Sequence, residues 1–247
     1  VIPPIFASSI ILFPASLGGW FGSSENMGWY EHQTLIELLE NIDIKDDYNT
    51  SNPRFAVQYV VRPMSDEYHD FRGYAGRVAS GVFNVGDEVV VLPSGLPSKI
   101  KTIETLNKKL DKAFVRQSVT ITLEDDIDIS RGDMIVQKND IPKSSQDIEM
   151  MVCWFNSKPM QNRGKYILRH TTNEIKCLIS EVEFKMDINS LAQNTNEKEV
   201  KMNDIAKLKI RTSKPLYYDS YNANRHTGSV ILIDEHTNET VAAGMII

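Results

Sequence analysis

The stretch DFRGYAGRVASGVFNVGDEVVVLPSG, residues 70–95, constrains the fold of this chain more than any other. Residues 76–80 alternate apolar side chains with polar or small ones, which is typical of a half-buried strand, and residues 89–92 form a second apolar run. Gly81 and Gly86 between the two runs supply the backbone freedom that turns require. The stretch therefore predicts two strands joined as an antiparallel hairpin.

Strand-like patterns continue through the rest of the chain. Residues 55–61 alternate in hydrophobicity and are followed by Pro63, which has no amide proton to offer a sheet. Further short runs rich in β-branched residues, separated by turn residues, cover 99–105, 113–123, 134–137, 149–155, 166–171, 175–187, 205–212, 228–234 and 239–246. Short strands at this spacing favour closed barrels, because closure removes exposed sheet edges.

A boundary divides these strands into two groups. The segment 138–147 contains Pro142 and a pair of serines, which break the strand pattern and indicate a loop. We therefore predict a mainly β fold with two successive β-barrels, residues 48–143 and 144–247, preceded by a short helical remnant. A Gly or Asn followed by Asp occurs before three of the predicted strands, at Gly86-Asp87, Gly132-Asp133 and Asn203-Asp204. We interpret this dipeptide as a recurring turn and not as part of an internal sequence repeat.

Residues 1–47 have a different character. Residues 1–24 carry no charge, but prolines and a Gly-Gly pair interrupt any continuous helix and no basic leader precedes the apolar run, so we expect no membrane span. Thr34 is placed to cap an amphipathic helix with apolar residues at helical spacing over 35–42. The charged run 43–47 is typical of a linker. We interpret 1–47 as a remnant of an upstream GTPase domain followed by one helix and a linker.

Charge and cysteine content restrict the class of function. The formal net charge is −6, and a general nucleic-acid surface needs a local excess of Lys and Arg to displace counterions, so we expect no nucleic-acid partner. Cys153 and Cys177 lie in apolar runs far apart in the sequence, which favours reduced, buried thiols in a cytoplasmic protein over a disulfide. No metal-binding spacing surrounds either cysteine.

The chemistry of a GTPase is absent from the sequence. A Gly-rich loop ending in Lys-Ser/Thr is needed to hold the β and γ phosphates with magnesium, and the chain contains none. The nucleophile elbow G-x-S-x-G and the zinc motif H-E-x-x-H are also absent. We therefore expect no catalytic, cofactor-binding or metal-binding residue in this chain.

Several strings in the right order carry a resemblance to a known family. GRVASGVFNVGDEV resembles the second domain of translational GTPases such as elongation factor Tu. DFRGYAGRVASG, VGDEVVVLPSG and ISRGDMIV together resemble the large, GTPase-bearing subunit of bacterial sulfate adenylyltransferase, a relative of those factors. MVCWF at 151–155, YILRHTT at 166–172 and NRHTGSVILID near the end agree with it. The resemblance covers roughly residues 24 to 247.

The resemblance implies a fold and a role. The barrels would correspond to domains 2 and 3 of elongation factor Tu, within a regulatory subunit of the enzyme that converts ATP and sulfate to adenosine 5′-phosphosulfate and pyrophosphate, coupled to GTP hydrolysis. It implies a heteromeric complex with ATP on a small adenylyltransferase subunit, and GTP and Mg on a GTPase domain outside this chain. The alternative is a translation-factor-like barrel pair that binds tRNA or RNA. Whether a fused kinase domain follows stays open.

A few residues are candidates for contacts with the small subunit or the GTPase domain. Phe71, Arg72 and Tyr74 lie close together at a loop, and aromatic and Arg side chains are enriched among the residues that dominate binding energy at interfaces. Alternatively, Phe71 and Tyr74 fill one end of their own barrel. Arg225 and His226 could together form an anion-binding surface, or lie in a loop packed across the barrel end, and His170 could be a hydrogen-bonded core residue. The interface candidates are Phe71, Arg72, Tyr74, His170, Arg225 and His226.

Overall fold

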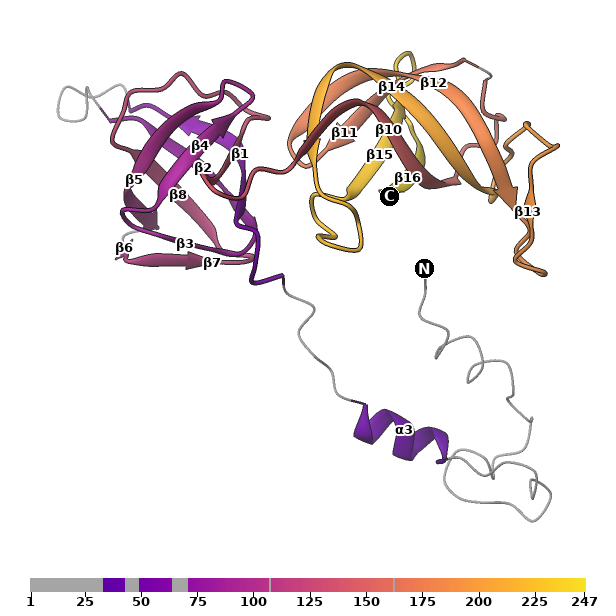
Figure 1. The fold of residues 1–247 in the computed structure, drawn as a ribbon, viewed down its shortest axis with the longest axis horizontal. Helices are drawn as coiled ribbons and strands as arrows, with labels where there is room; N and C mark the ends of the chain where they lie inside the picture. Colours follow the sequence, from indigo (N-terminus) through magenta and orange to yellow (C-terminus); the bar gives the residue numbers. More distant parts are fainter. Residues whose placement is uncertain (1–32, 43–48, 64–70, 107, 162) are drawn as a thin grey trace. The chain divides into compact units, whose positions relative to one another are not determined.

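The computed structural model describes residues 33–42, 49–63, 71–106, 108–161 and 163–247, and Figure 1 traces the chain. The chain divides into two compact units, Val1–Asp47 and Tyr48–Ile247. The expectations for residues 1–24 and for the linker 43–47 lie outside the described residues. The described part of the first unit is a single helix, and the described secondary structure of the second unit is entirely β.

The helix α3 (Leu35–Asn41) forms as the sequence predicts. The Thr34 hydroxyl accepts from the amide of Glu37 at 3.3 Å, and the Glu37 carboxylate accepts from the amide of Thr34 at 2.8 Å. This reciprocal pair is a capping box, which satisfies two amides that a helix start leaves without partners. The helix is short and none of its residues is buried.

The first barrel is closed by six strands (Figure 1). They follow one another in the order β4-β9-β1-β2-β8-β5, and β5 pairs back with β4. Their bounds are β1 Arg54–Val61, β2 Gly73–Ser80, β4 Glu88–Leu92, β5 Leu96–Thr105, β8 Ser118–Leu123 and β9 Met134–Gln137. The short strand β3 (Val82–Asn84) pairs with β7 (Lys112–Phe114), and β6 (Lys108–Leu110) pairs with β5. Phe55 and Phe83 pack edge to face in the core.

The predicted hairpin between residues 76–80 and 89–92 is wrong. Strand β2 pairs with β1 and β8, whereas β4 pairs with β5 and β9. The turn at Gly81 leads into β3, whose partner is the distant β7, so β2 and β4 do not become neighbours. The alternation identified both strands correctly but not their partners, because closure of the barrel decides which strands pair.

The second barrel is also closed by six strands. Their order is β11-β15-β16-β10-β14-β12, and β12 pairs back with β11. Their bounds are β10 Lys143–Trp154, β11 Lys165–His170, β12 Asn173–Met186, β14 Ile205–Tyr218, β15 Ser229–Asp234 and β16 Thr240–Ile246, with β13 Gln193–Asn194 added to β12. Strand β10 begins inside the segment 138–147 that the sequence predicts to be a loop. The prediction of two successive β-barrels is confirmed.

Both cysteines are free thiols, as the sequence predicts. Cys177 lies in the core of the second barrel, and Cys153 is half-buried on β10. Burial raises the pKa of the Cys177 thiol to about 12. A thiol in this environment stays protonated near neutral pH and is a weak nucleophile.

The recurring turn is the structural device that the sequence predicts. In each case a residue with positive φ is followed by an Asp, and the carboxylate of that Asp accepts from the amide three residues earlier. The bonds are Asn84 to Asp87 at 2.8 Å, Ser130 to Asp133 at 2.8 Å and Lys201 to Asp204 at 2.7 Å. A fourth copy uses Gln117, whose side-chain oxygen accepts from the amide of Phe114.

The two barrels are joined through a buried arginine. Arg54, the first residue of β1, is 1% exposed. Its guanidinium donates to the carboxylate of Asp219 at 3.0 and 3.1 Å, and to the carboxylate and carbonyl of Asp140 at 3.1 and 2.8 Å. Burial alone would lower the pKa of Arg54, but the bonds to both aspartates outweigh it and the pKa is raised. The charge is therefore compensated by one residue after β9 and one after β14.

Further contacts connect the two barrels at this junction. The side-chain amide of Asn224 donates to the Ser80 hydroxyl at 2.8 Å, and that of Asn49 donates to the carbonyl of Ala223 at 2.8 Å. Tyr217 packs against a small apolar cluster of β4 and β9, formed by Val90, Leu92, Met134 and Val136. The first barrel thus meets the second through polar and apolar contacts together.

We predict that Arg54→Ala destabilises the chain by about 3–5 kcal/mol, because it leaves the partly buried carboxylates of Asp140 and Asp219 without their partner. Arg54→Lys should recover only part of this loss, since an ammonium group cannot reproduce the planar fork. Urea unfolding measures both changes. The matched control is Arg131→Ala, an exposed arginine that donates to the carbonyl of Gln58, which should cost less than about 0.5 kcal/mol. Equal effects of the two alanine variants would contradict the prediction.

Candidate functional site

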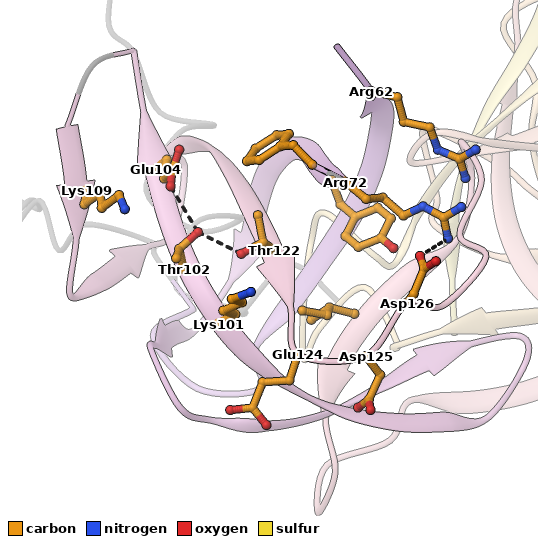
Figure 2. Close-up of a pocket in the computed structure, with 13 residues that line it drawn as sticks. Arg62, Arg72, Lys101, Thr102, Glu104, Lys109, Thr122, Glu124, Asp125 and Asp126 are labelled. Carbon is orange, nitrogen blue, oxygen red and sulfur yellow. Dashed lines mark hydrogen bonds and ion pairs between the residues drawn. The ribbon is translucent and has the colours of Figure 1, made fainter. Parts of the chain in front are cut away.

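The candidate site is a groove of about 580 Å³ on the first barrel. Figure 2 shows Arg62 and Arg72 on one side of it, and Lys101 and Lys109 on the other. Its walls come from the end of β1, the start of β2, strands β5, β6 and β8, and the acidic turn after β8. The residues that line it are Arg62, Phe71, Arg72, Tyr74, Lys101, Thr102, Glu104, Lys109, Thr122, Leu123, Glu124, Asp125 and Asp126.

Arg72 and Tyr74 fasten one wall of the groove to the acidic turn. The Arg72 guanidinium contacts the Asp126 carboxylate at 2.6 Å and donates to the carbonyl of Ile127 at 2.9 Å. The Tyr74 hydroxyl donates to the same carbonyl at 2.7 Å. Burial raises the pKa of Tyr74, which keeps the phenol protonated as a donor. The two side chains therefore hold the entry to β2 against the turn.

This geometry separates the predicted loop residues. Tyr74 is 1% exposed and belongs to the core, so it is a barrel plug and not an accessible contact. Arg72 is partly exposed and faces the groove. Phe71 is half-buried and also lines a second groove of about 440 Å³ together with Glu104 and Lys109, so its ring separates two hollows.

A glycine allows Phe71 to lie where it does. A Cβ atom at Gly73 would come within 2.6 Å of Thr120 Cγ2 and 2.9 Å of Phe71 Cε1. Any other residue would push the Phe71 ring or the Thr120 side chain away from β2, because neither distance is a tolerable contact. The glycine in the sequence DFRGY thus positions the aromatic ring between the two grooves.

The opposite wall carries a chain of hydroxyl groups and charges. Thr102 and Thr122 hydroxyls lie 2.8 Å apart, and Thr102 donates to the Glu104 carboxylate at 3.2 Å. Strand β5 pairs with β8, which brings these threonines together. The polar groups of this wall are fixed by bonds to one another, which suits recognition of a charged partner.

The histidine candidates lie elsewhere. His170 is buried in the second barrel, and its Nε2 lies 2.7 Å from the carbonyl of Thr227, which identifies Nε2 as the donor. Burial lowers the pKa of His170, although the Thr227 carbonyl and Asp219 act against that shift. His170 is a core residue and cannot contact a partner directly. Arg225 and His226 are exposed on the loop between β14 and β15.

The structure therefore brings together only part of the predicted set. Phe71 and Arg72 share the groove, His170 is internal to the second barrel, and Arg225 with His226 forms a separate surface. The sequence analysis missed the residues of the opposite wall, because in the sequence they cannot be told from ordinary outward-facing residues of strands. Only the pairing of β5 with β6 and β8 places them opposite Arg72: Lys101, Thr102, Glu104, Lys109 and Thr122.

The groove has the chemistry of a recognition surface. Among the described residues that line it there is no histidine or cysteine, so within this set its hydroxyl groups have no adjacent imidazole base of the kind that activates a nucleophile. Among the described residues, no group of three or more His, Cys, Asp or Glu side chains could hold a metal ion. In the same part of the chain, no helix has the length and apolar character that a membrane crossing requires.

Known structures share the two-barrel arrangement. Crystal structures of sup35 complexed with GDP and with GMPPNP match the chain with TM-scores of 0.71 and 0.72, at 13% and 12% identity. Each match covers 93% of this chain and 55% of the sup35 chain. The family model "GTP-eEF1A C-terminal domain-like" matches residues 147–247. The fold is therefore that of the paired barrels of translation-factor GTPases.

Relatives with similar sequences identify a family within this fold class. The chain is 42% identical over 225 residues to the "Bifunctional enzyme CysN/CysC" of Mycobacterium tuberculosis, and 42% identical over 224 residues to "Sulfate adenylyltransferase subunit 1" of Bacteroides fragilis. These alignments cover 91% of this chain, but only 37% and 46% of the relatives. The chain belongs with the sulfate adenylyltransferase subunit 1 proteins, as its motifs predict, and spans less than half of their length.

We predict that Tyr74→Ala lowers the melting temperature by several degrees, because truncation of a buried aromatic side chain costs about 3–5 kcal/mol. Arg72→Ala should lower it far less, since Asp126 is 81% exposed and Tyr74 still satisfies the carbonyl of Ile127. Thermal unfolding of both variants compares them, with Tyr59→Ala as the exposed aromatic control. Melting temperatures that fall equally in the Tyr74 and Tyr59 variants would show that Tyr74 is not a core residue.

Proposed function

We propose that this chain is the two-barrel part of the regulatory large subunit of sulfate adenylyltransferase. The intact enzyme would convert ATP and sulfate to adenosine 5′-phosphosulfate and pyrophosphate in the cytoplasm, coupled to GTP hydrolysis, during sulfate assimilation. The observation that carries the proposal is 42% identity over 91% of the chain to the "Sulfate adenylyltransferase subunit 1" of Bacteroides fragilis. GTP and magnesium would bind the GTPase domain, and ATP the small subunit.

The barrels would contribute contacts rather than chemistry. The described residues that line the groove include four basic side chains, the acidic turn after β8 and a half-buried aromatic ring, and none of them is a histidine or cysteine. Such a mixture suits a protein surface with complementary charges. We propose that Arg72 and Phe71 contact the small subunit or the GTPase domain, and that the two barrels pass on the nucleotide state by rigid-body movement.

The alternative of a tRNA-binding or RNA-binding barrel pair has less support. The chain carries a net charge of −6, and the carboxylates of Glu104, Glu124, Asp125 and Asp126 line the same groove as the basic groups. A phosphate backbone would meet repulsion there, since binding to nucleic acid depends on an excess of positive charge.

The experiment is to coexpress the tagged chain with the small adenylyltransferase subunit of its own organism. We predict that the two proteins copurify without RNA. Recovery of RNA, or of the tagged chain alone, would contradict the proposed function. A pull-down with the intact large subunit as a positive control shows that the small subunit is folded.

We predict further that Arg72→Ala weakens this association by on the order of 2 kcal/mol, because arginines at interface centres contribute on that scale. This corresponds to about a 30-fold increase in Kd, measured by biolayer interferometry. Arg211→Ala is the matched control, since Arg211 is an exposed arginine of the second barrel that pairs with Asp147. Unchanged affinity in the Arg72 variant would reject the groove as the contact with the small subunit and leave the subunit assignment standing.

A further inference from the structure

The second groove of the first barrel shares Phe71, Glu104 and Lys109 with the groove of the candidate site, which we call the first groove. The second groove has a volume of about 440 Å³, and two threonines contribute to its lining. The other described lining residues are Val61, Phe71, Leu106, Lys108, Lys109 and Glu104. None of them comes from the acidic turn after β8 that borders the first groove. The second groove therefore combines apolar side chains with an excess of positive charge.

Strand pairing brings the lining residues of the second groove together. Thr120 of β8 pairs with Glu104 of β5, and Glu104 pairs in turn with Lys109 of β6. A Cβ atom at Gly73 would collide with both Thr120 and Phe71, so both side chains lie against β2 at this point. The second groove is therefore fixed by the strands of the first barrel.

Leu106 is the most unusual residue of this lining. Thr105 of β5 pairs with Lys108 of β6, which places Leu106 in the tight turn between these strands. Leu106 has a φ of 33°, in the left-handed region that favours Gly or Asn, and its side chain is 94% exposed. A leucine here strains the backbone and leaves an apolar side chain in water, so packing within the barrel does not account for it. The position suits contact with a partner.

The positive charge of the second groove is not compensated by ion pairs. Lys108 and Lys109 are exposed, and neither ammonium group forms an ion pair or hydrogen bond in the part of the chain that the structure describes. The Glu104 carboxylate accepts from Thr102, which lines only the first groove (Figure 2). Carboxylates of a partner would complement the two lysines, because opposite charges across an interface steer and orient association.

We propose that the second groove binds a segment of the small adenylyltransferase subunit in which a large apolar side chain is flanked by Asp or Glu. The apolar side chain would contact Phe71 and Leu106, and the carboxylates would meet the two lysines. A nucleic-acid strand fits less well, because Val61 and Leu106 are aliphatic and offer no aromatic face on which a base could stack. The identity of the partner rests on the proposed function, whereas the chemistry of the segment rests on the groove.

The test is biolayer interferometry of the full 247-residue chain against the small subunit, with variants of two residues that line only the second groove. We expect Lys108→Glu and Leu106→Gly each to raise Kd about tenfold, because one reverses a complementary charge and the other removes an apolar contact. Lys165→Glu makes the same charge change at an exposed residue of the second barrel and should leave Kd unchanged.

Leu106→Gly also separates binding from folding. Glycine adopts a positive φ without strain, so this variant should keep or raise the melting temperature of the chain while it loses affinity. A residue with a merely structural role would lower both.

A second measurement probes the groove without the subunit. In an NMR titration, the blocked pentapeptide Asp-Glu-Phe-Glu-Asp should shift the amides of β5 and β6 saturably, and Lys108→Glu should abolish the effect. The control peptides Asp-Glu-Ser-Glu-Asp and Lys-Lys-Phe-Lys-Lys should bind more weakly, since each lacks one of the two features that the groove complements.

Each contrary result has a distinct meaning. Unchanged affinity for the small subunit in both groove variants would overturn this inference and leave the proposed function intact. If the unmodified chain does not bind the small subunit, the proposed function and this choice of partner both fail, and the peptide titration still decides the chemistry of the groove. Equal binding of all three peptides, or tighter binding of a single-stranded oligonucleotide, would overturn that chemistry.

Discussion

The arrangement of the two barrels depends on the burial of one positive charge. Taking the guanidinium of Arg54 out of water costs several kcal/mol unless anions and hydrogen bonds replace the lost solvent. Asp140, in the connection between the barrels, and Asp219, in the second barrel, supply both. Because Asp219 follows β14 of the second barrel, the charge is fully satisfied only when the two barrels meet. A single residue at the start of β1 therefore couples the formation of one barrel to the position of the other.

The network extends from this arginine into the core of the second barrel. Thr227 donates to Asp219 at 2.6 Å, and its carbonyl accepts from His170, which is buried on β11. Thr227 lies in the same loop as Arg225 and His226, so the surface at the junction is set by the bonds beneath it. The groove around Arg72, by contrast, is built from the first barrel alone. Two barrels held together in this way would move as one unit, which suits the proposal that they pass on the nucleotide state by rigid-body movement.

The sequence predicted the elements better than their partners. Alternation located β1, β4 and β9 closely, and the Gly-Asp pairs marked turns that use one bonding pattern. It failed for the hairpin between β2 and β4, because alternation reports which face is buried and not which strand lies alongside. The groove shows the same limit. Arg72 was recognisable as a candidate because aromatic residues flank it in the sequence. Lys101 and Glu104 have the sequence pattern of ordinary outward-facing strand residues, and only the closure of the barrel places them opposite Arg72. Nothing local in the sequence marked Arg54 as buried, since its partners lie 86 and 165 residues away.

The central claim is that the Arg54 network holds the two barrels as one body. Residual dipolar couplings of backbone amides, measured in a weakly aligned sample, report the orientation of each barrel independently. The account predicts that one alignment tensor fits the amides of both barrels, and that two different tensors are needed once Arg54 is replaced by methionine, with each barrel still folded. A requirement for two tensors in the unmodified chain, or one shared tensor in the Arg54→Met variant, would contradict it.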